Sequence, residues 1–520
     1  MKNGKNEGLG HIRTGELIYY YPLKFDSSLD FSSLCNHIYK SVDASFSSCC
    51  NQATDILKAD IQSHMDGTVS PETPQPNAPT CLFHDATFAI DPTPSSLKLE
   101  MHLGCMKAYS ARDELIDREY NEYKKIYGDA FTSMQNRILL PPLSVTLYNG
   151  KTVWLQAILI VFKNKMGVLK LELPLINVST EHFKNLDPDA YVESVIGGCI
   201  ASEQTSTLPF SELHRFYIKK ILACSTDGIS QIFCGPSIFN IILTDCEGSP
   251  EKIEHISPAI QKDLFEIIAA PVSERTYSSA TKLAEGYLEN HSWGNHIIKC
   301  FLSTCGGCLT LIETAFINYR ISECATDQSI PLSSIDESLK NEVHQIMLKS
   351  ACINVEFALI ILALKKMNND YIFREKAAGE RKIYDIQAEY NQTLILIADL
   401  QRSCMGTVYE QLNAFERMMP YYLNSDLAET TMSAIDRIQA SKETLTRERN
   451  QSLLSIISLV LTAVFGLPAI HDTISLLHTA LCKNHADIPY LSIDSISIFC
   501  WFLLLICLIY WFYRTIQKSK

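Results

Sequence analysis

Two long apolar segments lie near the end of the chain. Residues 450–471 and 495–513 contain no Asp, Glu, Lys or Arg, and both are rich in Leu and Ile. A helix of about 20 apolar residues matches a bilayer hydrocarbon core of about 30 Å. The pattern predicts two transmembrane helices, at about 451–470 and 495–513, joined by an external loop at 471–494.

Positive charges flank both apolar segments and set their expected orientation. The loop between the segments contains a single lysine, Lys483, whereas the outer flanks contain Lys442, Arg447, Arg449, Arg514, Lys518 and Lys520. Lysine and arginine are concentrated on the cytoplasmic side of membrane proteins. We therefore expect a multi-pass protein of the inner (plasma) membrane with both termini in the cytoplasm.

Helical patterns precede the first apolar segment. Residues 338–367 read as one helix, and its apolar run at 353–367 is too short to span a membrane, so it is expected in a core. A second helix is predicted over 375–418, ending before Pro420. A third begins near Ser425. The sequence contains no helix-breaking residue from there to Leu467, which predicts a continuous helix of about 60 Å.

Strand patterns dominate the first part of the chain. Residues 143–178 alternate β-branched and apolar residues around an Asn-Gly turn at 149–150, which indicates a hairpin. Residues 80–91 and 229–245 also read as strands, and 66–80 as a proline-rich loop. With the helices, this gives a cytosolic α/β domain followed by a helical stalk and a two-helix membrane hairpin. The expected boundaries are 1–330, 331–450 and 451–520.

The composition and the net charge narrow the classes of ligand that the chain is expected to bind. The chain is 47% hydrophobic and 20% charged, with a formal net charge of −13. A nucleic-acid surface needs a clustered basic footprint, so direct nucleic-acid binding is not expected. Small anions remain compatible with this charge, because one local pocket suffices for them. The sequence contains no phosphate-loop or dinucleotide-binding motif.

The eighteen cysteines include one local cluster. Cys300, Cys305 and Cys308 place three thiols within nine residues, and His291 or His296 could complete a zinc site. The sequence has no second CxxC and no HxxxH pattern, so reduced structural thiols are the preferred interpretation and no metal site is assigned.

A polar stripe follows the first apolar segment. At 100° per residue, five small or polar residues fall within about 80° of one another, and Arg447 extends the line toward the cytoplasmic side. They are Gln451, Ser455, Ser458, Thr462 and Gly466. In an oligomer this face could line a pore that holds a partly hydrated cation. The alternative is that these residues only let helices pack closely, with Ser and Thr bonded to the backbone.

The layout resembles the CorA-type metal ion transporters. That resemblance implies a pentamer whose first transmembrane helix lines the pore and ends in a Gly-Met-Asn motif that meets hydrated Mg²⁺. Here the equivalent residues are Gly466, Leu467 and Pro468. Since proline has no side-chain acceptor, the ring that selects hydrated Mg²⁺ is missing.

Because it departs from the Gly-Met-Asn motif, the chain resembles a divergent branch of that family, the CorA-like effectors of type III CRISPR antiviral defence. This resemblance implies a homo-oligomeric channel opened by a nucleotide second messenger in the cytosolic domain, with a divalent cation as cargo and no certain cofactor. The sequence does not identify the pocket. Glu429, Asp436 and Glu443, at sevenfold spacing on the stalk, read as a solvated face rather than a Mg²⁺ sensor.

Other functions stay open. The chain could be a constitutive divalent-cation transporter, or a membrane-anchored scaffold without transport. An enzyme is not expected, because the sequence has no recognisable catalytic motif. His11, His37 and His214 read as surface or core residues.

Overall fold

The computed structural model describes most of the chain in several stretches. These are residues 8–40, 121–181 (except 122, 129–131 and 147–151), 213–319 (except 225–227, 250–252, 254–255, 270–280, 296, 305 and 314), 337–378, 383–402, 406–482 and 493–518. The chain divides into two compact units, Met1–Glu429 and Thr430–Lys520. An α/β sheet domain and a helical C-terminal region are present, as the sequence predicts.

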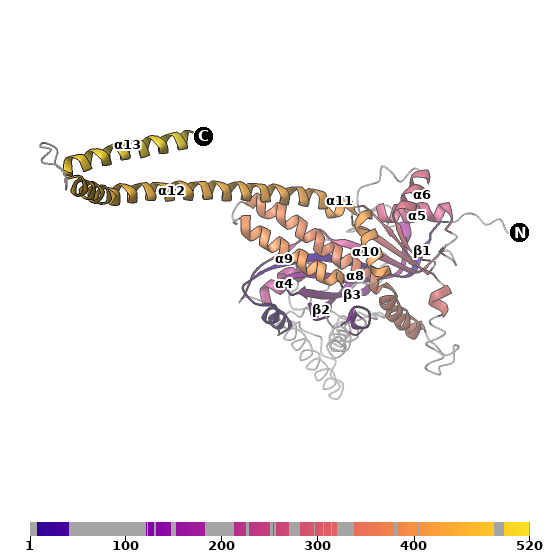
Figure 1. The fold of residues 1–520 in the computed structure, drawn as a ribbon. Helices are drawn as coiled ribbons and strands as arrows, with labels where there is room; N and C mark the ends of the chain where they lie inside the picture. The colour runs from indigo at the N-terminus through magenta and orange to yellow at the C-terminus, as the bar shows by residue number, and fades with distance from the viewer. Residues whose placement is uncertain are drawn as a thin grey trace, which may run out of the picture. The chain divides into compact units, whose positions relative to one another are not determined.

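A nine-stranded sheet forms the centre of the first unit (Figure 1). Its order is β2-β3-β4-β1-β6-β9-β8-β7, and β5 pairs with part of β1. All pairs are antiparallel except β6 with β9. The strands are β1 (His11–Ser27), β2 (Gln135–Thr146), β3 (Thr152–Phe162), β4 (Met166–Ser179), β5 (Ile229–Cys234), β6 (Ile238–Cys246), β7 (Ser292–Gly294), β8 (Ile298–Leu302) and β9 (Gly307–Ile312).

Alternation along β1 divides the core into two layers. Leu17, Tyr19 and Tyr21 join the apolar cluster on one face, whereas Ile18 and Tyr20 join the cluster on the other. Successive side chains of a strand point to opposite faces, so a strand covered on both faces is apolar throughout. The long central strand is therefore buried between two helical layers.

Each helical layer comes from a different part of the chain. The first cluster is covered by α4 (Leu213–Cys224), α5 (Pro258–Ala269) and α6 (Thr281–Asn290), together with a helix at residues 31–40. The second is covered by α8 (Glu337–Ala378), α9 (Ile383–Arg402), α10 (Thr407–Met418) and α11 (Pro420–Leu423). The predicted helical bundle is thus one layer of the sheet domain.

The predicted strands that fall within the described residues are confirmed, but the structure divides each segment into more than one strand. The hairpin predicted at 143–178 contains the end of β2 and all of β3 and β4, and residues 229–245 hold two strands, β5 and β6. The Asn-Gly turn at 149–150 lies outside the described residues, although β2 and β3 pair antiparallel on either side of it. The strand expected at 80–91 and the loop at 66–80 also lie outside them.

The first two predicted helices differ from the structure in length and in one break. The first is longer than expected, and its apolar run at 353–367 is buried in the core as predicted. The single helix expected over 375–418 is wrong, because α8 ends at Ala378 and the rest forms α9 and α10. Gly406, which caps α10, has a φ of 57°, a left-handed conformation that a continuing helix cannot contain. The helix ends before Pro420, as predicted.

The second unit is built from two long helices. α12 (Ser425–Cys482) begins where predicted but continues through Pro468, so the first part of the expected loop at 471–494 is helical. α13 (Ile493–Lys518) follows. Among the residues that the structure describes, no helix combines the length and the apolar content needed to cross a membrane.

Candidate functional site

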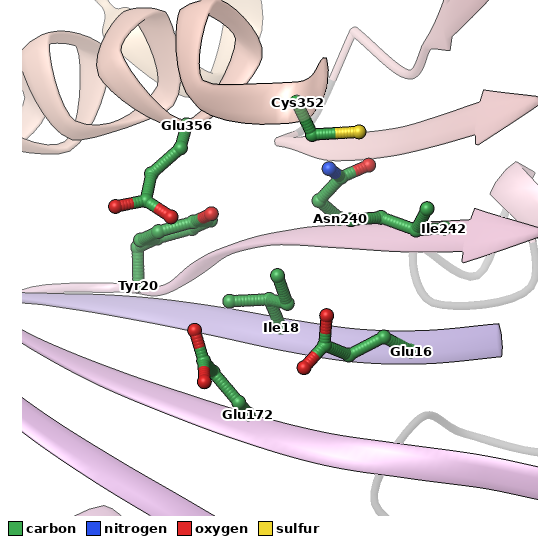
Figure 2. Close-up of a pocket in the computed structure, with 8 residues that line it drawn as sticks. All are labelled: Glu16, Ile18, Tyr20, Glu172, Asn240, Ile242, Cys352 and Glu356. Atoms are coloured by element: carbon green, nitrogen blue, oxygen red, sulfur yellow. The ribbon is translucent and has the colours of Figure 1, made fainter. Parts of the chain in front are cut away.

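Buried charges join α8 to the sheet. Figure 2 shows the two carboxylates of this cluster, Glu356 on α8 and Glu172 on β4. Glu356 of α8 accepts a hydrogen bond from Lys170 Nζ at 2.5 Å and one from Tyr123 Oη at 2.7 Å. Arg137 of β2 lies 3.4 Å from the same carboxylate, and Lys170 lies 2.5 Å from Glu172 on its own strand. The positive charges of Arg137 and Lys170 therefore face two carboxylates inside the domain, which belong to Glu172 and Glu356.

Burial makes this cluster electrostatically sensitive. The side chains of Arg137, Lys170 and Glu172 are at most 2% exposed, and that of Glu356 is 13% exposed. Burial alone would raise the pKa of Glu356, but the charges of Lys170 and Arg137 outweigh it and lower the pKa below its usual value. Burial, followed by the charge of Glu356, raises the pKa of Tyr20. Glu356 is thus an ionised carboxylate within a low-dielectric core.

The space beside the cluster is too small for a ligand. A cavity of about 10 Å³ lies among Glu16, Tyr20, Asn240 and Cys352, next to Glu356. That volume corresponds to about one water molecule. The cluster therefore fixes α8 against the sheet, and it does not form a binding site for a metabolite.

The cysteine cluster occupies the β8–β9 hairpin. Cys300 and Cys308 are buried on neighbouring strands and both contact the Thr310 hydroxyl, while Cys305 and His296 lie outside the described residues. Burial raises the pKa of the Cys308 thiol well above its usual value, which opposes the thiolate that zinc requires. In the described part of the chain, no group of three His, Cys, Asp or Glu could hold a metal ion.

Gly306, in the Cys-Gly-Gly-Cys motif, has a structural role. Gly306 has a φ of 106°, and a Cβ there would lie 2.6 Å from Tyr422 Cδ2. Gly306→Ala is therefore expected to lower the free energy of unfolding by about 1–3 kcal/mol, measured by chemical denaturation. Gly286→Ala in α6 is the control, because no atom lies within 4 Å of its added Cβ. Equal losses in both variants would contradict this role for Gly306.

The polar stripe lies on the exposed surface of α12. Gln451, Ser455, Ser458 and Thr462 are exposed, as is Arg447 one turn before the stripe begins. Pro468 is exposed inside the helix, while the side chain of Leu467 lies outside the described residues. The helix thus presents the predicted polar residues together on its exposed surface.

Two contacts show how α12 packs against α13. A Cβ at Gly466 would lie 3.9 Å from Trp501 Cδ1, and His471 Nε2 lies 3.0 Å from Asp494 Oδ1. Because the contacts advance along α12 while they recede along α13, the two helices pack antiparallel. Gly466 therefore lies at the helix–helix contact.

The remaining candidate residues lie apart from any site. Glu429, Asp436 and Glu443 are exposed along α12, in agreement with a solvated face. His214 stacks on Tyr21 with ring centroids 4.4 Å apart, and His11 is exposed.

The sequence interpretation did not identify Arg137, Lys170 and Glu172 as a buried cluster. Glu356, a charge inside an apolar helical run, was the available signal.

No family model, curated protein or solved structure matches the chain.

Proposed function

We propose that the chain is the subunit of an oligomeric membrane channel of CorA-like plan, opened by a small anionic ligand that binds the α/β domain. In this proposal α12 lines the pore through Gln451, Ser455, Ser458 and Thr462, and α13 is the outer helix. The nucleotide messenger, the divalent-cation cargo and the place in type III CRISPR defence follow from the resemblance alone.

Exposed apolar side chains on α12 and α13 carry this proposal. Leu454 and Phe465 on α12, and Phe499 on α13, are 65%, 68% and 66% exposed, and many neighbouring Leu and Ile residues are similar. Large contiguous apolar surfaces mark membrane or protein contacts. A line of hydroxyl and amide groups within such a surface supports a polar axis shared between subunits.

A membrane anchor without transport is the second candidate. Thr462 Oγ1 donates to the Ser458 carbonyl at 2.8 Å, and Gly466 contacts α13. Hydroxyls bonded to the preceding turn and glycines at helix contacts are typical of packing faces. These two contacts favour a stripe that holds helices together.

Reconstitution of the purified full chain tests the proposal. Liposomes containing a Mg²⁺-sensitive dye would be assayed with and without a panel of nucleotides. Cation flux that requires one nucleotide is the expected result, because a ligand opens a channel only if it binds the open state more tightly. Flux without a nucleotide would favour a constitutive transporter. Silent vesicles with confirmed insertion would favour the anchor.

A further inference from the structure

A larger cavity lies at another part of the first unit. It has a volume of about 260 Å³ and lies between the end of β1, the β3–β4 turn and helices α8 and α9. The polar and aromatic groups that matter for its chemistry are Lys24, Lys163, Asn164, Lys165, Tyr371 and Glu389.

The β3–β4 turn supplies two of its lysines. Lys165 has a φ of 62°, and its backbone N–H donates to the Phe162 carbonyl at 2.9 Å, which closes the turn. Its Nζ donates to the Ser27 carbonyl at 2.6 Å, so this ammonium group is fixed at the cavity wall. Lys163 is exposed at the other side of the turn. A tight hairpin thus holds two cations at the opening.

The third lysine is held between the sheet and the helices. Lys24 Nζ lies 3.4 Å from the centroid of the Tyr371 ring and forms an ion pair with Glu389 of α9. A neighbouring bond links the β3–β4 turn to α9, because Asn164 Nδ2 donates to Thr393 Oγ1 at 3.2 Å. Lys24 is therefore positioned by a cation–π contact and by a carboxylate that an incoming anion could replace.

The charge of the cavity is opposite to that of the whole chain. Three lysines lie on its wall with two carboxylates, Asp26 and Glu389, while the formal net charge of the protein is −13. Asp26 already accepts a hydrogen bond from Ser230 Oγ at 2.7 Å. Pockets for drug-sized ligands are about 300–1,000 Å³, so this cavity lies just below that range.

We infer that this cavity binds a phosphate ester no larger than a mononucleotide, with Lys24, Lys163 and Lys165 around the phosphate. The phosphate replaces Glu389 as the partner of Lys24 and so releases one contact between β1 and α9. As the ligand site of the proposed channel, this inference rests on the proposed function, but its binding chemistry can be measured without any membrane flux.

Calorimetry of the purified full chain with adenosine monophosphate tests the site. Lys163→Gln is expected to weaken binding by about tenfold, because an ion-assisted contact is lost. Glu389→Gln is expected to strengthen it by about threefold, because the competing carboxylate is gone. Lys262→Gln on α5, outside the cavity, is the matched control and should leave the affinity unchanged. Opposite shifts at two exposed or half-exposed positions cannot arise from misfolding.

Several results would overturn the inference. These are an absence of calorimetric binding, equal binding of adenosine, unchanged affinity in Lys163→Gln, or weaker affinity in Glu389→Gln. Binding only of inorganic phosphate, or only of phosphatidic acid vesicles, would also exclude a soluble phosphate ester. Lysine-dependent binding that leaves flux unchanged would retain the site and reject the ligand-gated channel. Nucleotide-gated flux without binding in this cavity would reject the site and retain the ligand-gated channel.

Discussion

Replacing Glu356 by glutamine is expected to lower the free energy of unfolding of the sheet domain by about 3–5 kcal/mol. The variant leaves Arg137 and Lys170 buried with Glu172 as the one remaining carboxylate of the described cluster. Native domains are stable by only about 5–15 kcal/mol, so this is a large fraction. Chemical denaturation of the purified chain, followed by circular dichroism, measures the change.

Two comparisons make the Glu356 prediction specific. Glu410 on α10 is exposed, and Glu410→Gln is expected to change stability by less than about 0.5 kcal/mol. The pKa of folded Glu356 is lowered from its ordinary value of 4.5, so its contribution is present above that value and is lost as the pH falls through the folded pKa. The wild type should therefore lose more stability than Glu356→Gln in acid. Parallel pH profiles would contradict an ionised Glu356.

Thr462→Leu is expected to lower cation flux by about tenfold or more, if the stripe lines a pore. Each subunit loses a hydroxyl contact of about 0.5–1.5 kcal/mol. Summed around an oligomeric ring, the barrier rises by more than about 1.4 kcal/mol, which corresponds to tenfold. Flux from dye-loaded liposomes, normalised to inserted protein, measures the effect.

Ser452→Leu is the matched control for Thr462→Leu. Ser452 Oγ donates to the Glu448 carbonyl at 2.9 Å, the same backbone contact that Thr462 makes with Ser458. It lies about 80° around the helix from Thr462, away from the stripe. Flux should fall only in the Thr462 variant. Unchanged flux in both would support a packing face, whereas equal losses would indicate a general effect on helix packing.

Local patterns predicted much of the fold. Alternation marked β3 and β4, and turn residues and Pro420 marked where helices begin and end. The break before α10 was missed because it depends on the left-handed backbone at Gly406, in a segment whose neighbours favour helix. The strand β1 was also missed, because its continuous buried run, Leu17–Leu23, lacks the alternation of a half-exposed strand.

The charged sites were harder to predict. The alternation of β4 suggests a solvent-facing side for Lys170 and Glu172, yet α8 covers that side and both residues are buried. Only the long-range pairing of helix and sheet brings Glu356 to them. The basic turn at 163–165 was visible as two nearby lysines, but its cavity depends on Lys24 and Glu389, which are 365 residues apart.

The central position of β1 has a consequence for synthesis. Leu17 pairs with Leu173 on one side and with Ile241 on the other, so the ribosome makes this strand 224 residues before its second partner. At about 5–20 residues per second, translation takes about 10–45 seconds to supply that partner. Both edges of this strand are open until β4 is made, and one stays open until β6 follows. Chaperone contact with the nascent N-terminal segment is the expected protection against premature aggregation.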